Sequence, residues 1–94
     1  MIWPFGVRGK LLRELDRLAF YNDKNIAYLK HDDAQVQIER AASIARIEVL
    51  VSEIGRNRLP QPFLTALGDG YVATDMTGHY LRQVKSHFRN RGAP

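Results

Sequence analysis

The chain has 94 residues, 45% of them hydrophobic and 26% charged, a composition typical of a folded globular domain that excludes a disordered tail. It contains no cysteine, which excludes disulfides, thiolate metal sites and thiol nucleophiles. The net charge of +4 is unevenly distributed, because residues 1–55 carry eight basic and eight acidic residues, whereas residues 56–94 carry six basic and two acidic ones. The C-terminal part is therefore expected to attract phosphate groups or acidic protein surfaces.

Residues 1–7 form an apolar N-terminal arm that contains Trp3 and Phe5. Because charged residues follow at once, the arm is too short for a signal peptide or a membrane span. We expect it to fold over the helices instead of lying on a membrane, since Glu14 and Asp16 weaken attraction to anionic lipid. The sequence predicts one domain over residues 1–94 and a cytoplasmic location.

Residues 8–55 are predicted to be helical, because no glycine or proline occurs between Lys10 and Ile54. In the first half of this region, apolar residues recur at alternating spacings of three and four, which indicates one apolar stripe along a helix. Asn22 interrupts the stripe. Its members are Leu12, Leu15, Ala19, Asn22, Ile26 and Leu29.

The second half, residues 34–54, has two apolar sides and a narrow polar stripe. One side comprises Ile38, Ala41, Ala42, Ala45 and Val49, the other comprises Ile44, Ile47, Val51 and Ile54, and the polar stripe comprises Glu39, Ser43, Arg46 and Glu53. Such a helix requires burial over most of its circumference, as in the centre of a bundle or in an oligomer. We predict a homo-oligomer, most simply a dimer, with an interface formed by Ile38, Ala42, Ile44, Ile47, Val51 and Ile54.

Two candidate breaks divide the helical region. One is Asn22-Asp23, and the other is His31-Asp32-Asp33, where Asp32 and Gln35 resemble a capping box. With a break, the two halves form an antiparallel hairpin; without one, they form a continuous rod that must oligomerise. We favour the hairpin, because helices in small domains are usually short and fold back on each other.

Glycines and prolines divide the rest of the chain into short pieces. Gly55 is expected to end the second helix, and Leu59-Pro60-Gln61-Pro62 to form an extended connection. Residues 63–67 are predicted to form one or two helical turns closed by Gly68-Asp69-Gly70, and residues 71–73 a short extended piece.

A last helix is predicted after Thr74 or Asp75, either of which can cap it. Its inward stripe comprises Thr77, Leu81, Val84 and Phe88, and its basic residues Arg82, Lys85 and Arg89 face outward. The predicted fold class is therefore all-α, a helical hairpin or small helical bundle with a C-terminal basic helix, and residues 56–94 contain the Pro/Gly connection and that helix.

No pattern of residues predicts catalysis. Ser43, Ser52 and Ser86 lack the sharp turn that presents a nucleophile, and Ser86 and its neighbour His87 point in different directions on a helix. His79 and His87 are too far apart along one helix to bind the same metal ion. We therefore predict no enzyme, no metal site and no cofactor. If the chain were an enzyme, Asp69, Asp75, His79 and Tyr80 would be the first group to examine.

The favoured function is binding of a protein partner, as a small adaptor, regulator or inhibitor. The residues expected to carry the binding are Trp3, Phe5, Arg82, Lys85, Arg89 and Arg91, because aromatic and arginine side chains dominate protein interfaces. The alternative is nucleic-acid binding through the same basic helix, which predicts a steep loss of affinity as salt is added.

Overall fold

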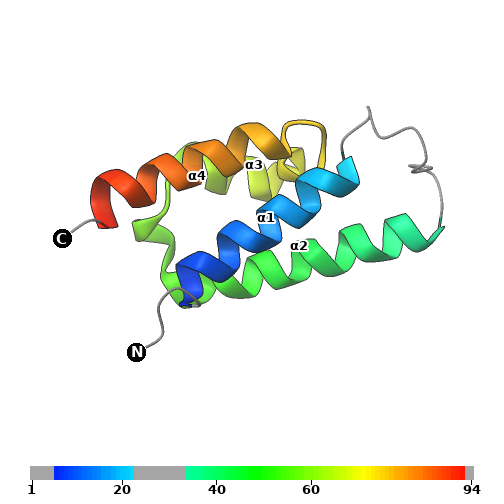
Figure 1. The fold of residues 1–94 in the computed structure, drawn as a ribbon, viewed down its shortest axis with the longest axis horizontal. Coiled ribbons are helices and arrows are strands. Elements are labelled where there is room, and N and C mark those ends of the chain that lie inside the picture. Colours follow the sequence, from blue (N-terminus) through cyan, green and yellow to red (C-terminus); the bar gives the residue numbers. More distant parts are fainter. Residues whose placement is uncertain (1–5, 23–33, 93–94) are drawn as a thin grey trace.

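The computed structural model describes residues 6–22 and 34–92, and their regular structure is entirely helical. The helices form a small bundle in which α1 crosses between α2 and α4, while α3 lies behind α4 in the view of Figure 1. The elements in chain order are α1 (Val7–Asn22), α2 (Ala34–Ile54), the 3-10 helix η1 (Arg56–Arg58), α3 (Gln61–Asp69), the 3-10 helix η2 (Tyr71–Ala73) and α4 (Thr77–Gly92).

Helices α1 and α2 run in opposite directions, as the contacts between them show. Glu14 in the middle of α1 contacts Arg46, whereas Asn22 at the end of α1 contacts Arg40 near the start of α2. The chain therefore forms the antiparallel hairpin, not the continuous rod. Helix α1 ends at the first candidate break and α2 begins directly after the second, while the expected capping residue Asp32 lies outside the described residues.

The buried face of α1 is rotated relative to the predicted stripe. Leu11, Leu15 and Leu18 are completely buried, whereas Leu12 and Ala19 are only half-buried. The rotation arises because α1 packs against both α2 and α4, so its buried face is centred between the two neighbours.

Helix α2 buries a polar residue that the sequence placed on its polar stripe. Ser43 is fully buried, because it lies one turn from both Arg40 and Arg46, whose side chains reach α1, and therefore faces that helix. The opposite side of α2 is open: Ile38 and Val49 are each 60% exposed. Of the two apolar sides predicted for this segment, one packs against the core and the other faces solvent.

The connection after α2 is shorter and more helical than predicted. Gly55 ends α2 with a φ of 102°, which favours glycine, and only Leu59 and Pro60 are extended. Pro62 lies in the first turn of α3, where its missing N–H leaves no helical hydrogen bond unmade.

The prediction of an extended piece at residues 71–73 is wrong, because this segment forms η2. Gly70 turns the chain with a φ of 87°, and the tight 3-10 turn that follows places Val72 completely inside the core. A strand there would have no partner strand among the described residues. The prediction for residues 63–67 is confirmed, since they lie in α3.

The inward stripe predicted for the last helix is confirmed. In α4, Thr77 and Val84 are buried, and Leu81 and Phe88 are partly buried against the core. The hydroxyl oxygen of Thr74 accepts a hydrogen bond from the backbone N–H of Met76 at 3.1 Å, just before α4 begins.

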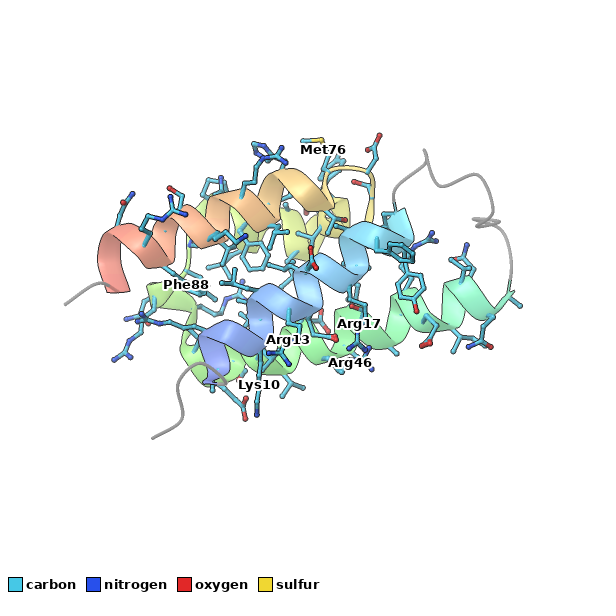
Figure 2. All side chains as sticks on the ribbon, viewed as in Figure 1. Lys10, Arg13, Arg17, Arg46, Met76 and Phe88 are labelled. Atoms are coloured by element: carbon cyan, nitrogen blue, oxygen red, sulfur yellow. The ribbon has the colours of Figure 1, made fainter. Side chains whose placement is uncertain are left out.

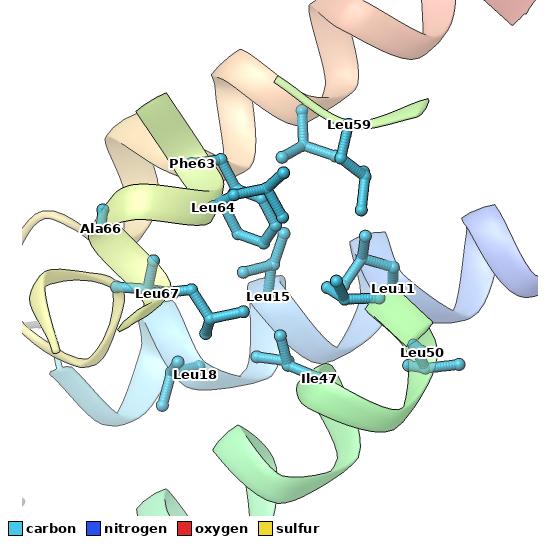
Figure 3. Close-up of a cluster of buried hydrophobic side chains, with 13 residues drawn as sticks. Leu11, Leu15, Leu18, Ile47, Leu50, Leu59, Phe63, Leu64, Ala66 and Leu67 are labelled. Carbon is cyan, nitrogen blue, oxygen red and sulfur yellow. The ribbon is translucent and has the colours of Figure 1, made fainter. Parts of the chain in front are cut away.

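The core contains side chains from all four α-helices and from η2. Leucines of α1 pack against Ile47 and Leu50 of α2 and against Phe63 and Leu67 of α3 (Figure 3). Burial of apolar surface is worth about 25 cal/mol per Å², so this cluster supplies the main stabilising free energy. The complete cluster is Leu11, Leu15, Leu18, Ile47, Leu50, Val51, Leu59, Phe63, Leu64, Ala66, Leu67, Val72 and Val84.

A buried polar junction joins three helices at one end of the bundle. The side-chain amide of Asn22 donates to the hydroxyl of Thr77 at 3.0 Å, and its oxygen accepts from Arg40 Nε at 2.6 Å. The Thr77 hydroxyl in turn donates to the carbonyl oxygens of Val72 and Thr74. Asn22, which interrupts the apolar stripe, is therefore the residue through which α1 forms hydrogen bonds with both α2 and α4.

Thr77→Val should lower the free energy of unfolding by about 2 kcal/mol, because the buried amide of Asn22 and the carbonyl of Val72 would both lose a partner. Urea denaturation followed by circular dichroism measures the change. The matched control is Thr65→Val on the exposed face of α3, which should change stability by less than about 0.5 kcal/mol. Equal effects of the two substitutions would contradict a role for the junction.

Ser43→Ala should raise the free energy of unfolding by about 1 kcal/mol, because the buried Ser43 hydroxyl has no hydrogen-bond partner among the described residues. Ser52→Ala, on the exposed side of the same helix, controls for the higher helix propensity of alanine, worth about 0.5 kcal/mol. Thermal unfolding of both variants gives the comparison. A loss of stability in Ser43→Ala would contradict this account of the hydroxyl.

Candidate functional site

A groove of about 470 Å³ lies between α1 and α2 and is open to solvent. Its cationic side chains lie along α1 and on the facing side of α2, and the labels in Figure 2 mark them. We refer to it as the α1–α2 groove. Its lining residues are Lys10, Arg13, Glu14, Arg17, Ala45, Arg46, Val49 and Leu50.

The rim of the groove is cationic because of the spacing of basic residues in α1. Lys10, Arg13 and Arg17 are three and four residues apart, so they form one line along the helix. This line lies on the side of α1 away from the buried leucines, and all three residues are exposed. Arg46 adds a fourth cation from α2, while Glu14 is the sole carboxylate in the lining.

Glu14 lies at the boundary between the rim and the core. Only 9% of its side chain is exposed, and its two carboxylate oxygens accept hydrogen bonds from Arg46 Nε at 2.8 and 3.0 Å. Arg17 lies 4.0 Å away on the same carboxylate. The hydrogen bond to Glu14 raises the pKa of Arg46 above its ordinary value, because it stabilises the charged guanidinium.

The floor of the groove is apolar. Ala45, Val49 and Leu50 form it, and Val49 stays 60% exposed although it is a large hydrophobic residue. Along the outer side of α2 the apolar surface continues through Ala41 to Ile38, which is also exposed. The result is an apolar strip that runs along α2 and enters a groove with a cationic rim.

The basic residues predicted to bind a partner lie elsewhere. Arg82, Lys85 and Arg89 are exposed on α4, which is separated from α2 by α1, so they do not join the groove. Arg91 is part of α4. Trp3 and Phe5 lie outside the described residues.

The residues predicted to form an oligomer interface have different surroundings. Ile47 and Val51 are buried in the core of the single chain, and Ile44 and Ile54 are partly buried against it. Ala42 is half-buried, and Ile38 is exposed. Any contact with a second copy through this helix therefore depends on Ile38 and the apolar strip beside it.

The histidines of α4 have structural contacts. His79 packs edge-on against the ring of Tyr80 with 4.9 Å between ring centroids, and His87 donates from Nε2 to the carbonyl of Arg58 at 3.1 Å. Asp69 and Tyr80 line a second groove between α3 and α4, and His79 is not part of that lining. In residues 6–22 and 34–92, no three histidine, aspartate or glutamate side chains lie together as a metal site.

The line of cations in α1 is visible in the sequence, but the zero net charge of residues 1–55 hides it when charges are only counted. Residues 1–55 have no net charge, yet Lys10, Arg13 and Arg17 lie on one side of a helix. Only the packing of α2 beside them shows that an apolar floor accompanies this line of cations.

Comparisons with known protein families, with curated proteins and with solved structures found no match. None of the described helices is both long and apolar enough to cross a membrane.

Arg46→Met should lower the free energy of unfolding by about 1 kcal/mol, because it leaves the nearly buried Glu14 without its main hydrogen-bond donor. The effect is modest because 46% of the Arg46 side chain is exposed. Methionine keeps the aliphatic contacts. The double variant Glu14→Gln with Arg46→Met should recover part of the lost free energy of unfolding. If the losses of the two single variants simply add in the double variant, Glu14 and Arg46 are not energetically coupled.

Proposed function

We propose that the protein is a non-enzymatic interaction protein, an adaptor, regulator or inhibitor, whose α1–α2 groove binds an acidic amphipathic helix of a protein partner. The observation that supports this function is the composition of the groove: four cationic side chains surround an apolar floor and only one carboxylate is present. A helix with an apolar stripe and flanking carboxylates complements both parts.

Binding of this kind follows the helix-in-groove mode, in which apolar anchors every three or four residues enter an apolar floor. Val49 and Leu50 offer the apolar contact, and the strip through Ala41 and Ile38 extends it along α2. The alanines of α2 let a second helix approach closely. Affinity then comes mainly from burial of this surface.

The cationic rim selects the partner. Exposed ion pairs contribute only about 0–1 kcal/mol each, so Lys10, Arg13 and Arg17 add little affinity one by one. Together they favour an acidic helix over a basic one and speed its approach, because like charges across an interface are costly.

A second copy of the chain is the competing occupant. The outer side of α2 carries the apolar residues Ile38 and Val49 together with the exposed acidic residues Glu48 and Glu53. This helix therefore has the same chemistry as the proposed partner. Self-association as a dimer through α2 is our second candidate.

The test uses two fluorescein-labelled 20-residue helical peptides with the same leucine face, one flanked by glutamates and the other by lysines. Fluorescence anisotropy should show that the glutamate peptide binds at least about tenfold more tightly. Arg13→Glu with Arg17→Glu should weaken its binding by about tenfold, because two rim cations become repulsive.

The matched control reverses the same charge outside the groove, as Arg82→Glu with Lys85→Glu on α4. It should leave peptide binding within about twofold of the unmodified protein. Equal affinity for both peptides, or equal weakening by the two double variants, would contradict the proposal. Light scattering that gives a dimer mass, reduced to a monomer by Val49→Asp, would show a second copy as the occupant.

A further inference from the structure

Parts of three segments without acidic residues lie together at one end of the bundle. Residues 6–13, 54–68 and 76–92 contain no aspartate or glutamate, although these stretches lie far apart in the sequence. They include the start of α1, all of η1 and all of α4. In Figure 1 the first turn of α1, η1 and the last turns of α4 lie at the same end of the molecule.

Two contacts show that these parts are close together. The Nε2 proton of His87 in α4 is donated to the carbonyl of Arg58 in η1 at 3.1 Å, and the guanidinium of Arg8 in α1 lies 5.2 Å from the ring centroid of Phe88. The last turns of α4 are therefore in contact with both η1 and the start of α1.

This arrangement collects five exposed cations, which we call the basic end: Arg8, Arg56, Arg58, Lys85 and Arg89. None of the five forms an ion pair with a carboxylate within residues 6–22 and 34–92. Cations that share one end of a molecule and lack carboxylate partners produce a positive field there, which attracts a polyanion.

Arg82 does not belong to the basic end. Its guanidinium lies beside Gly78, in the first turn of α4, and so points away from the last turns of the helix. The basic residues of α4 therefore do not act as one continuous helix face. The tertiary structure instead combines two of them with arginines from α1 and η1.

The surroundings of the basic end indicate a nucleic acid. The exposed large hydrophobic residues of the described chain are Phe20, Ile38, Val49, Tyr71 and Met76, and none lies in the first turn of α1, in η1 or in the last turns of α4. A membrane or a protein interface usually adds apolar contacts to its cations. A phosphate backbone requires mainly cations and hydrogen-bond donors.

We propose that the basic end binds the phosphate backbone of nucleic acid without reading its bases. The site shares no residue with the α1–α2 groove, so it is independent of the function proposed above. Recognition is by charge, through arginines of α1 and η1 together with the basic residues of the last turns of α4.

The probe is a fluorescein-labelled 20-base-pair DNA duplex, used with two unrelated sequences. Anisotropy titrations at several salt concentrations should give similar dissociation constants for both sequences, and the logarithm of the association constant should fall with log salt with a slope of about −4. In the double variant Arg56→Gln with Arg58→Gln, the salt dependence should become less steep, with a slope of about −2. Binding at low salt should weaken by at least about tenfold.

The control is Arg13→Gln with Arg17→Gln, which removes the same charge from the groove and should leave the DNA slope unchanged. Circular dichroism verifies folding, and the contact between Arg58 and His87 is retained because it uses the backbone carbonyl. Absence of binding to the duplex at low salt, or equal weakening by the control, would overturn the proposal. So would binding to vesicles of phosphatidylcholine and phosphatidylserine in place of DNA.

Discussion

The structure depends on the burial of α1 on two sides at once. Leu11, Leu15 and Leu18 are completely removed from water because α2 covers one side of the helix and α4 the other. The hydrophobic free energy of this burial has no preferred direction, so it holds the helices together but does not fix how far each is shifted along its neighbour. It also determines which residues of α1 remain outside, namely the line of cations beside α2.

Directional bonds at the boundary of the core supply the register. Asn22 accepts from Arg40 of α2 and donates to Thr77 of α4, so the end of α1 has one position relative to both neighbours. Half-way along α1, Glu14 accepts two hydrogen bonds from Arg46. Since an unpaired buried polar group is costly, a shift of either helix by one turn would be strongly disfavoured.

The same packing creates two surfaces of different chemistry. On one side of α1, the rim cations stand beside the exposed Val49 of α2, and an apolar floor with a charged border results. At the end of the bundle, η1 and the start of α1 both contact the last turns of α4, and within residues 6–22 and 34–92 no large exposed hydrophobic residue lies there. We infer a helical protein segment for the first surface and a phosphate backbone for the second.

The sequence by itself determined the helical class, the end of α2 at Gly55, the helical turns of residues 63–67 after the two prolines and the inward stripe of α4 from Thr77 to Phe88. These features depend on local properties, namely helical periodicity, the φ freedom of glycine and the missing donor of proline. Only the tertiary structure decided that Ser43 is buried, that residues 71–73 form a 3-10 turn around Val72, and which cations stand together. The reason is that burial and charge clustering depend on contacts between segments distant in sequence, which a helical pattern along one segment does not contain.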